Sequence, residues 1–232
     1  MITQNTTVFE TVADLFYRVE AGDNLDQAET LLESLSKSES DPAILARVYA
    51  ELAQAQIWRY EYAQANQRLA FAEKGVKMAT RALEYDPNNL QANFWAAATM
   101  GTHGMEMGIM SSLFYLGRIK THCEQTLQLD ETYQNAAAHQ ILADLYRMTP
   151  PKPIGIGDKQ KALVHLLRAR ELAPTCPKAK LRLAELYINL RKKDLARREI
   201  QLLLDQDIPE HGPIYAEKVK AQARDLLLKK LG

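Results

Sequence analysis

The sequence predicts an all-α fold of about eleven helices, arranged in pairs that repeat along the chain. Apolar residues recur at three- and four-residue steps, and no long stretch shows the strict alternation typical of a half-buried strand. The helix-breaking positions are themselves periodic: Pro42, Pro87, Glu131 and Pro174 follow one another at intervals of 45, 44 and 43 residues. Each interval is long enough for two helices, and stacked helix pairs share a continuous core.

The elements follow in order from the N-terminus. Residues 1–41 are expected to form the first helix pair, and residues 42–131 form longer and more degenerate repeats. The second of these segments begins with Asp41-Pro42, because an Asp side chain caps free N–H groups and a proline in the first turn sacrifices no hydrogen bond.

The remaining segments complete a single domain over residues 1–232. Residues 132–208 contain the clearest repeats, with Asp158 as the start signal of the helix KQKALVHLLRARELA. Residues 213–231 are expected to form a C-terminal helix whose apolar side caps the last repeat.

The two clearest units resemble the tetratricopeptide repeat (TPR). Both place large, small and aromatic residues in the same order before a small residue on the second helix: Leu183, Ala184, Tyr187 and Ala196 in one unit, and Leu142, Ala143, Tyr146 and Ala162 in the other. The resemblance implies a right-handed α-solenoid with an inner groove, which in this superfamily takes a peptide or helix of a partner protein.

A closer resemblance covers about residues 80–208. It rests on the helix FWAAATMGTHGMEMG, the pair HQILADLYRMTP and GIGDKQKALVHLLRARELAP, and the segment LRLAELYINL. Together these resemble the variant TPR family that contains the T component of TRAP-type transporters and the microtubule-dynamics regulators. The resemblance implies a non-catalytic interaction scaffold or, as the alternative, a ligand-binding accessory protein of a transport system.

Composition and charge narrow the class of protein. The formal net charge is zero, but residues 1–116 contain 8 Lys and Arg against 15 Asp and Glu, whereas residues 117–232 contain 21 against 14. Halves with balances of −7 and +7 favour binding of a protein partner or head-to-tail association between copies of the chain. The alternative is that both charged surfaces face only solvent. Dense basic runs interleaved with aromatic residues are missing, which argues against nucleic-acid binding.

The sequence also predicts where the protein resides. No stretch reaches the roughly 18 apolar residues of a membrane span, and the opening residues lack the basic and apolar regions of a secretory signal. The predicted location is cytoplasmic, with a periplasmic location as the alternative if a signal peptide has been removed.

No motif indicates an enzyme, a cofactor or a metal site. The two cysteines form no CxxC pair, and the five histidines show no metal-ligand spacing. On a continuous helix, Met100, His103, Met107, Met110 and Phe114 would share one face. Thioether and imidazole ligands suit Cu(I), but we favour a methionine-rich packing face beside glycines that allow close approach.

Partner or ligand binding is expected in the groove between stacked helices. The candidate residues are Asn93, Trp95, His103, Met107, Tyr115, Arg147 and Lys180. Buried aromatic side chains at helical spacing are more often core residues. The basic cluster Arg191–Lys193 with Arg197 and Arg198 is interpreted as a solvated rim, with a site for an anionic partner as the alternative.

Overall fold

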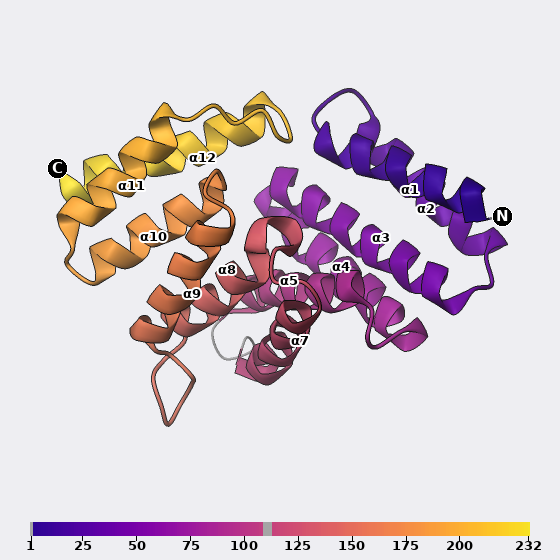
Figure 1. The fold of residues 1–232 in the computed structure, drawn as a ribbon, viewed down its shortest axis with the longest axis horizontal. Coiled ribbons are helices and arrows are strands. Elements are labelled where there is room, and N and C mark those ends of the chain that lie inside the picture. The colour runs from indigo at the N-terminus through magenta and orange to yellow at the C-terminus, as the bar shows by residue number, and fades with distance from the viewer. Residues whose placement is uncertain (1, 109–112) are drawn as a thin grey trace. The chain divides into compact units, whose positions relative to one another are not determined.

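The computed structural model describes residues 2–108 and 113–232 and confirms the all-α fold class. The chain forms two compact units, residues 1–129 and 130–232 (Figure 1). The first unit contains α1 (Ile2–Tyr17), α2 (Asn24–Ser38), α3 (Pro42–Tyr62), α4 (Ala65–Tyr85), α5 (Leu90–Met107), the short 3-10 helix η1 (Leu113–Tyr115) and α7 (Leu116–Leu129). The second contains α8 (Tyr133–Met148), α9 (Lys159–Leu172), α10 (Pro177–Asn189), α11 (Lys193–Asp205), α12 (Pro213–Leu226) and the π-helix η2 (Leu227–Leu231). The described residues thus form eleven α-helices.

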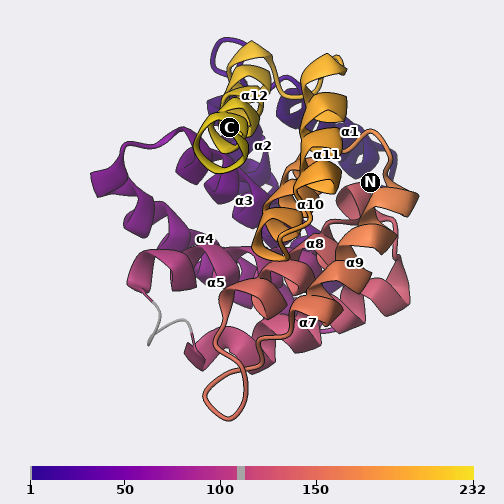
Figure 2. The same ribbon diagram turned by 90° about the vertical axis from the view of Figure 1, so that its left-hand side faces the viewer.

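The helices pack in consecutive pairs. In the first unit the pairs are α1 with α2, α3 with α4, and α5 with α7, and in the second they are α8 with α9 and α10 with α11. First helices of successive pairs also touch, as α3 touches α5 and α8 touches α10. Figure 2 shows α10, α11 and α12 next to one another at the C-terminal end of the second unit. The tetratricopeptide-type pairing expected from the sequence is therefore present within each unit.

Polar side chains fix several helix starts. The Asp41 carboxylate accepts a hydrogen bond from the Ala43 backbone N–H at 2.8 Å, and Asp158 accepts from the N–H groups of Gln160 and Lys161. Asn89 caps α5 in the same way. Each cap satisfies a backbone donor that the first turn would leave unpaired, and the sequence predictions for Asp41 and Asp158 are confirmed.

Two helix boundaries adopt left-handed backbone conformations without glycine. At the start of α8, Gln134, Asn135 and Ala136 have φ values of 51°, 59° and 56°. After α10, Arg191 has a φ of 61°, and the Lys192 N–H reaches back to the Tyr187 carbonyl at 2.8 Å. That bond defines a Schellman turn, whose left-handed position usually contains glycine.

The core of the first unit depends on one close approach. A Cβ on Gly75 of α4 would lie 2.9 Å from the Thr99 Cγ2 of α5 and 3.4 Å from the Gln56 Cβ of α3. Thr99 is fully buried, and its hydroxyl donates to the Trp95 carbonyl at 2.7 Å. Glycine therefore permits the contact between the three helices.

The prediction that Met100, His103, Met107, Met110 and Phe114 share one helix face is wrong. Helix α5 ends at Met107, and Gly108 follows with a φ of 84°. Met100 is fully buried, whereas Met107 and Phe114 are 46% and 78% exposed. The glycine interrupts the helix before a single face can form, and Met110 lies outside the described residues.

Candidate functional site

The seven predicted binding residues are divided between the two units. Asn93, Trp95, His103, Met107 and Tyr115 belong to the first unit, and Arg147 and Lys180 to the second. The structure thus brings together groups within each unit, and their contacts are described separately.

Asn93 and Trp95 are part of the packed interior of α5. Asn93 is fully buried, its Nδ2 donates to the Pro87 and Asn89 carbonyl oxygens, and its Oδ1 lies 2.8 Å from the His122 Nδ1 of α7. Trp95 is 7% exposed and packs edge-on against Phe94. Burial lowers the pKa of His122, with a smaller contribution from Arg118. Asn93 therefore joins α5 to α7, and Trp95 is a buried core residue.

His103 and Tyr115 form a contact near the end of α5. The His103 Nδ1 lies 3.0 Å from the Tyr115 hydroxyl, and the two rings meet edge to face. The buried Nε2 of His103 has no hydrogen-bond partner among the described residues. Met107 is half-exposed at the end of the same helix. Within the described residues, the contact of His103 with Tyr115 is the one side-chain contact found between predicted residues of the first unit.

Arg147 belongs to a network that joins two successive first helices. We call Gln140, Asp144, Arg147, Arg182 and Glu185 the α8–α10 polar face. Asp144 accepts from the Arg147 Nε and from the Arg182 Nε, each at 2.7 Å. Arg147 also reaches Glu185 at 2.9 Å, and Arg182 donates to the Gln140 Oε1 at 3.0 Å.

The electrostatics of this face favour the charged state of each group. Burial opposes charge on Asp144, but the nearby guanidinium groups of Arg182 and Arg147 outweigh it and leave the Asp144 pKa below its usual value. Burial likewise opposes charge on Arg182, yet Asp144 raises the Arg182 pKa overall. The four charged side chains remain 16–31% exposed, so a partner can reach charges whose positions are already fixed.

The sequence contains a signal for this face. Asp144 and Glu185 occupy the same position in the two repeats, in the segments LADLY and LAELY. An acidic residue between the small and aromatic positions of both units predicts carboxylates on successive first helices.

Lys180 lies elsewhere in the second unit. Its side chain is 5% exposed and donates to the Gln206 Oε1, while the Gln206 Nε2 donates to the Thr175 carbonyl at 2.9 Å. Burial lowers the pKa of Lys180, and the nearby Arg170 adds to the effect. Lys180 thus joins α10 to the end of α11, and no described contact joins it to Arg147.

A histidine pair connects α8 to α9. The Nδ1 atoms of His139 and His165 are 2.8 Å apart, and the His139 Nε2 lies 2.9 Å from the Glu131 Oε1. Arg168 donates to both oxygens of Glu131. The hydrogen bonds from Arg168 and His139 lower the Glu131 pKa to about 2, and Tyr146 stacks on His165.

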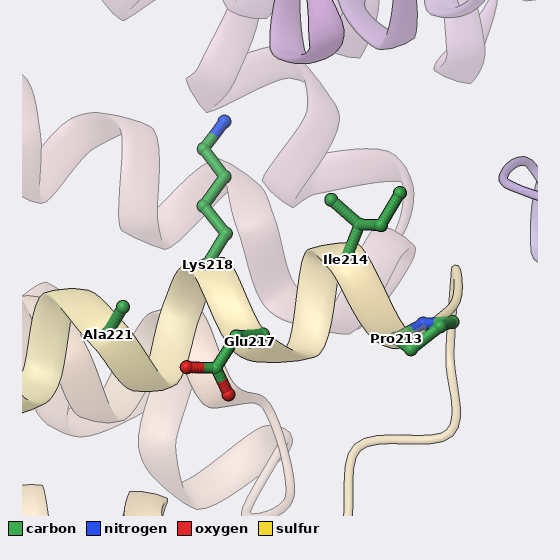
Figure 3. Close-up of a pocket in the computed structure, with 5 residues that line it drawn as sticks. All are labelled: Pro213, Ile214, Glu217, Lys218 and Ala221. Atoms are coloured by element: carbon green, nitrogen blue, oxygen red, sulfur yellow. The ribbon is translucent and has the colours of Figure 1, made fainter.

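Two further observations concern ligands and membranes. Within residues 2–108 and 113–232, no three His, Cys, Asp or Glu side chains are grouped so that they could hold a metal ion. Nor does any described helix combine the length and apolar character needed to cross a bilayer. Helix α12 has a shallow hollow where Ile214 and Lys218 project from the same side (Figure 3).

Comparison with known proteins identifies the family. The family model described as regulator of microtubule dynamics protein 1-3 matches residues 11–143, more than half of the chain. The chain belongs to this family. The match runs from within α1 through most of α8. It includes residues 11–129 of the first unit but only Gln140 of the α8–α10 polar face. No curated protein matches the chain significantly.

The regulator family assignment agrees with a structural comparison. The chain is similar to TTC0263, a thermophilic TPR protein of Thermus thermophilus, with a TM-score of 0.68 and 17% identity over 97% of this chain and 99% of that one. At that identity the likeness concerns the fold. The TPR-type fold that the sequence suggested is confirmed.

Proposed function

We propose that the protein is a non-catalytic scaffold that binds a protein partner on the first helices of its repeats, with the α8–α10 polar face as the binding surface. The supporting observation is the fixed, partly exposed set of charges on two successive first helices. Helical-repeat proteins bind partners on such extended surfaces. Charges that are already held in place lose little conformational entropy when a partner binds.

The internal pairing of this face also suggests how it would act. Every charged member has an oppositely charged neighbour, so the face offers a pattern of charge rather than a single sign. Such patterns contribute more to the choice of partner than to total affinity, because a partner whose charges do not match the pattern is repelled.

Site-specific photo-cross-linking tests the proposal. A photoreactive residue at Glu185, on a first helix, is expected to capture a defined polypeptide in extracts of the source cells. The same residue at Glu171, a 70% exposed position on the second helix α9, is the matched control. Equal capture at both positions, or capture at neither, would contradict the proposal.

The family description supplies a first partner to examine. We propose tubulin as that partner, because the matched family is described as regulating microtubule dynamics. Co-sedimentation with polymerised tubulin is expected to decrease when Glu185 is replaced by Gln and to persist when Glu171 is replaced by Gln. Retention of binding by both variants would place the contact elsewhere on the chain.

A further inference from the structure

A cluster of basic residues lies at one end of the second unit. We call it the C-terminal basic patch: Arg191, Lys192, Lys193, Arg197, Arg198, Lys229 and Lys230, all exposed. A hydrogen bond from Arg197 to the Leu231 carbonyl holds η2 beside the start of α11. Of the seven residues, only Arg197 and Lys229 have ion pairs in the described part of the chain, with Asp194 and Asp225.

Arg191 is costly to the fold. It occupies the left-handed position of the Schellman turn after α10, at a φ of 61°. A residue with a Cβ is sterically disfavoured there, whereas glycine is not. Packing gives no reason for an arginine, because the side chain is exposed.

Lys192 and Lys193 add an unfavourable electrostatic interaction at the start of α11. They are the N-cap and first residue of α11, where only Asp194 is acidic. The N-terminus of a helix carries partial positive charge, so cations there are unfavourable. An anionic surface placed against the patch would offset both this repulsion and that between the neighbouring cations.

The chain contains a surface of opposite charge. Residues 2–41, which include α1 and α2, contain nine Asp and Glu against two Lys and Arg. Asp26 and Glu29 among them are paired with Arg59 of α3, so the surface is less acidic than this count. Glu10 and Glu33 in the same range are exposed and have no ion pair in the described part of the chain. We call the surface of the helix pair α1 and α2 the N-terminal acidic pair.

We propose that the C-terminal basic patch of one copy binds the N-terminal acidic pair of a second copy, so that the protein associates head to tail. The proposal rests on the scaffold function and names one of its partners. The two surfaces differ, so each copy keeps one unused surface, and the association continues into a ring or a filament. The full chain supplies both charges, which makes another copy of the chain the occupant of the patch.

Sedimentation velocity of the full chain over a range of protein concentrations measures the association. The dissociation constant is expected to rise at least tenfold between about 50 mM and about 500 mM NaCl, because salt screens exposed charges. A monomer at all concentrations overturns the proposal. So does a monomer that only changes shape with salt, since its two surfaces would then meet within one chain.

Charge exchange makes the test specific. Lys193→Glu/Arg198→Glu reverses part of the basic patch, and Glu10→Lys/Glu33→Lys reverses part of the acidic pair. Each variant alone is expected to be monomeric. An equimolar mixture is expected to associate again, because the unaltered acidic pair of the first variant then meets the unaltered basic patch of the second. Association of either variant alone, or a mixture that stays monomeric while both variants retain the wild-type circular dichroism, overturns the proposal.

A matched control and a second readout complete the design. Lys152→Glu/Lys159→Glu changes the charge of the second unit by the same amount at exposed positions outside the patch, and is expected to leave the association unchanged. Failure of self-association leaves the tubulin and cross-linking tests of the α8–α10 polar face unaffected. Loss of partner capture at Glu185 with intact self-association would instead remove the proposed binding surface alone.

Discussion

Replacing Asp144 with Asn tests whether the α8–α10 polar face also holds the second unit together. Asp144 accepts two charge-assisted hydrogen bonds at 2.7 Å, from Arg147 on its own helix and from Arg182 on α10. The amide of Asn retains one acceptor oxygen, but it turns an N–H₂ group toward one of the guanidinium groups. The variant therefore loses one of these bonds and the negative charge that both arginines share.

The magnitude follows from the exposure of the three side chains. Hydrogen bonds to charged groups contribute about 1.5–3 kcal/mol each when water is excluded. The side chains of Asp144 and Arg182 are each 24% exposed and that of Arg147 is 16% exposed, so water replaces part of the loss. We expect the free energy of unfolding to fall by about 2–3 kcal/mol, which lowers Tm by about 4–12 °C for a chain of this length.

Urea unfolding followed by circular dichroism measures the change. Glu84→Gln is the matched control, because it removes the carboxylate of an exposed pair with Arg81, whose side chains are 57% and 51% exposed. That control is expected to stay within about 0.5 kcal/mol of the wild type. An Asp144→Asn value equally close to the wild type would refute the reasoning, since it would mean that this network adds no stability.

Three further predictions concern single residues. Glu131 has a pKa lowered from 4.5 to about 2, so the stability that it contributes is present above pH 4.5 and is lost as the pH falls toward 2. In urea unfolding at a series of pH values, Glu131→Gln should reduce this loss of unfolding free energy in acid. Gly75→Ala should lower the free energy of unfolding by about 1 kcal/mol, because overpacking against Thr99 outweighs the gain in helix propensity. Adding Thr99→Ser, which removes the contacting methyl group, should restore it. Burial raises the pKa of the Cys123 thiol, so Ellman's reagent should modify Cys123 only in urea, and rapid labelling of the native protein would contradict its burial.

The sequence predicted the helices better than the site. Period, breakers and caps are local signals, and Asp41 and Asp158 begin helices as those signals indicate. Asn93 and Trp95 were predicted in a groove because a helical face can be read from spacing, but spacing does not tell which neighbour covers that face. Asn93 lies against α7, and its amide is used within the core.

The contacts of Arg147 could not be predicted from the sequence, because they join residues far apart along the chain. The partner of Arg147 on α10 is Glu185, 38 positions along the chain, and only the stacking of α8 on α10 brings the two together. The methionine face failed for a different reason: Gly108 allows a positive φ that ends α5, and periodicity alone does not reveal such an end.

The packing of α8 on α9 at the histidine pair depends on which ring nitrogens carry hydrogen. Two Nδ1 atoms 2.8 Å apart share one hydrogen, and the His139 nitrogen that faces the Glu131 carboxylate carries another. If both Nδ1 atoms carried hydrogen, two N–H groups would point at each other, and if neither did, two lone pairs would. The closed arrangement therefore requires complementary tautomers of the two rings, so that α8 and α9 are joined by the matched orientation of both side chains rather than by either one alone.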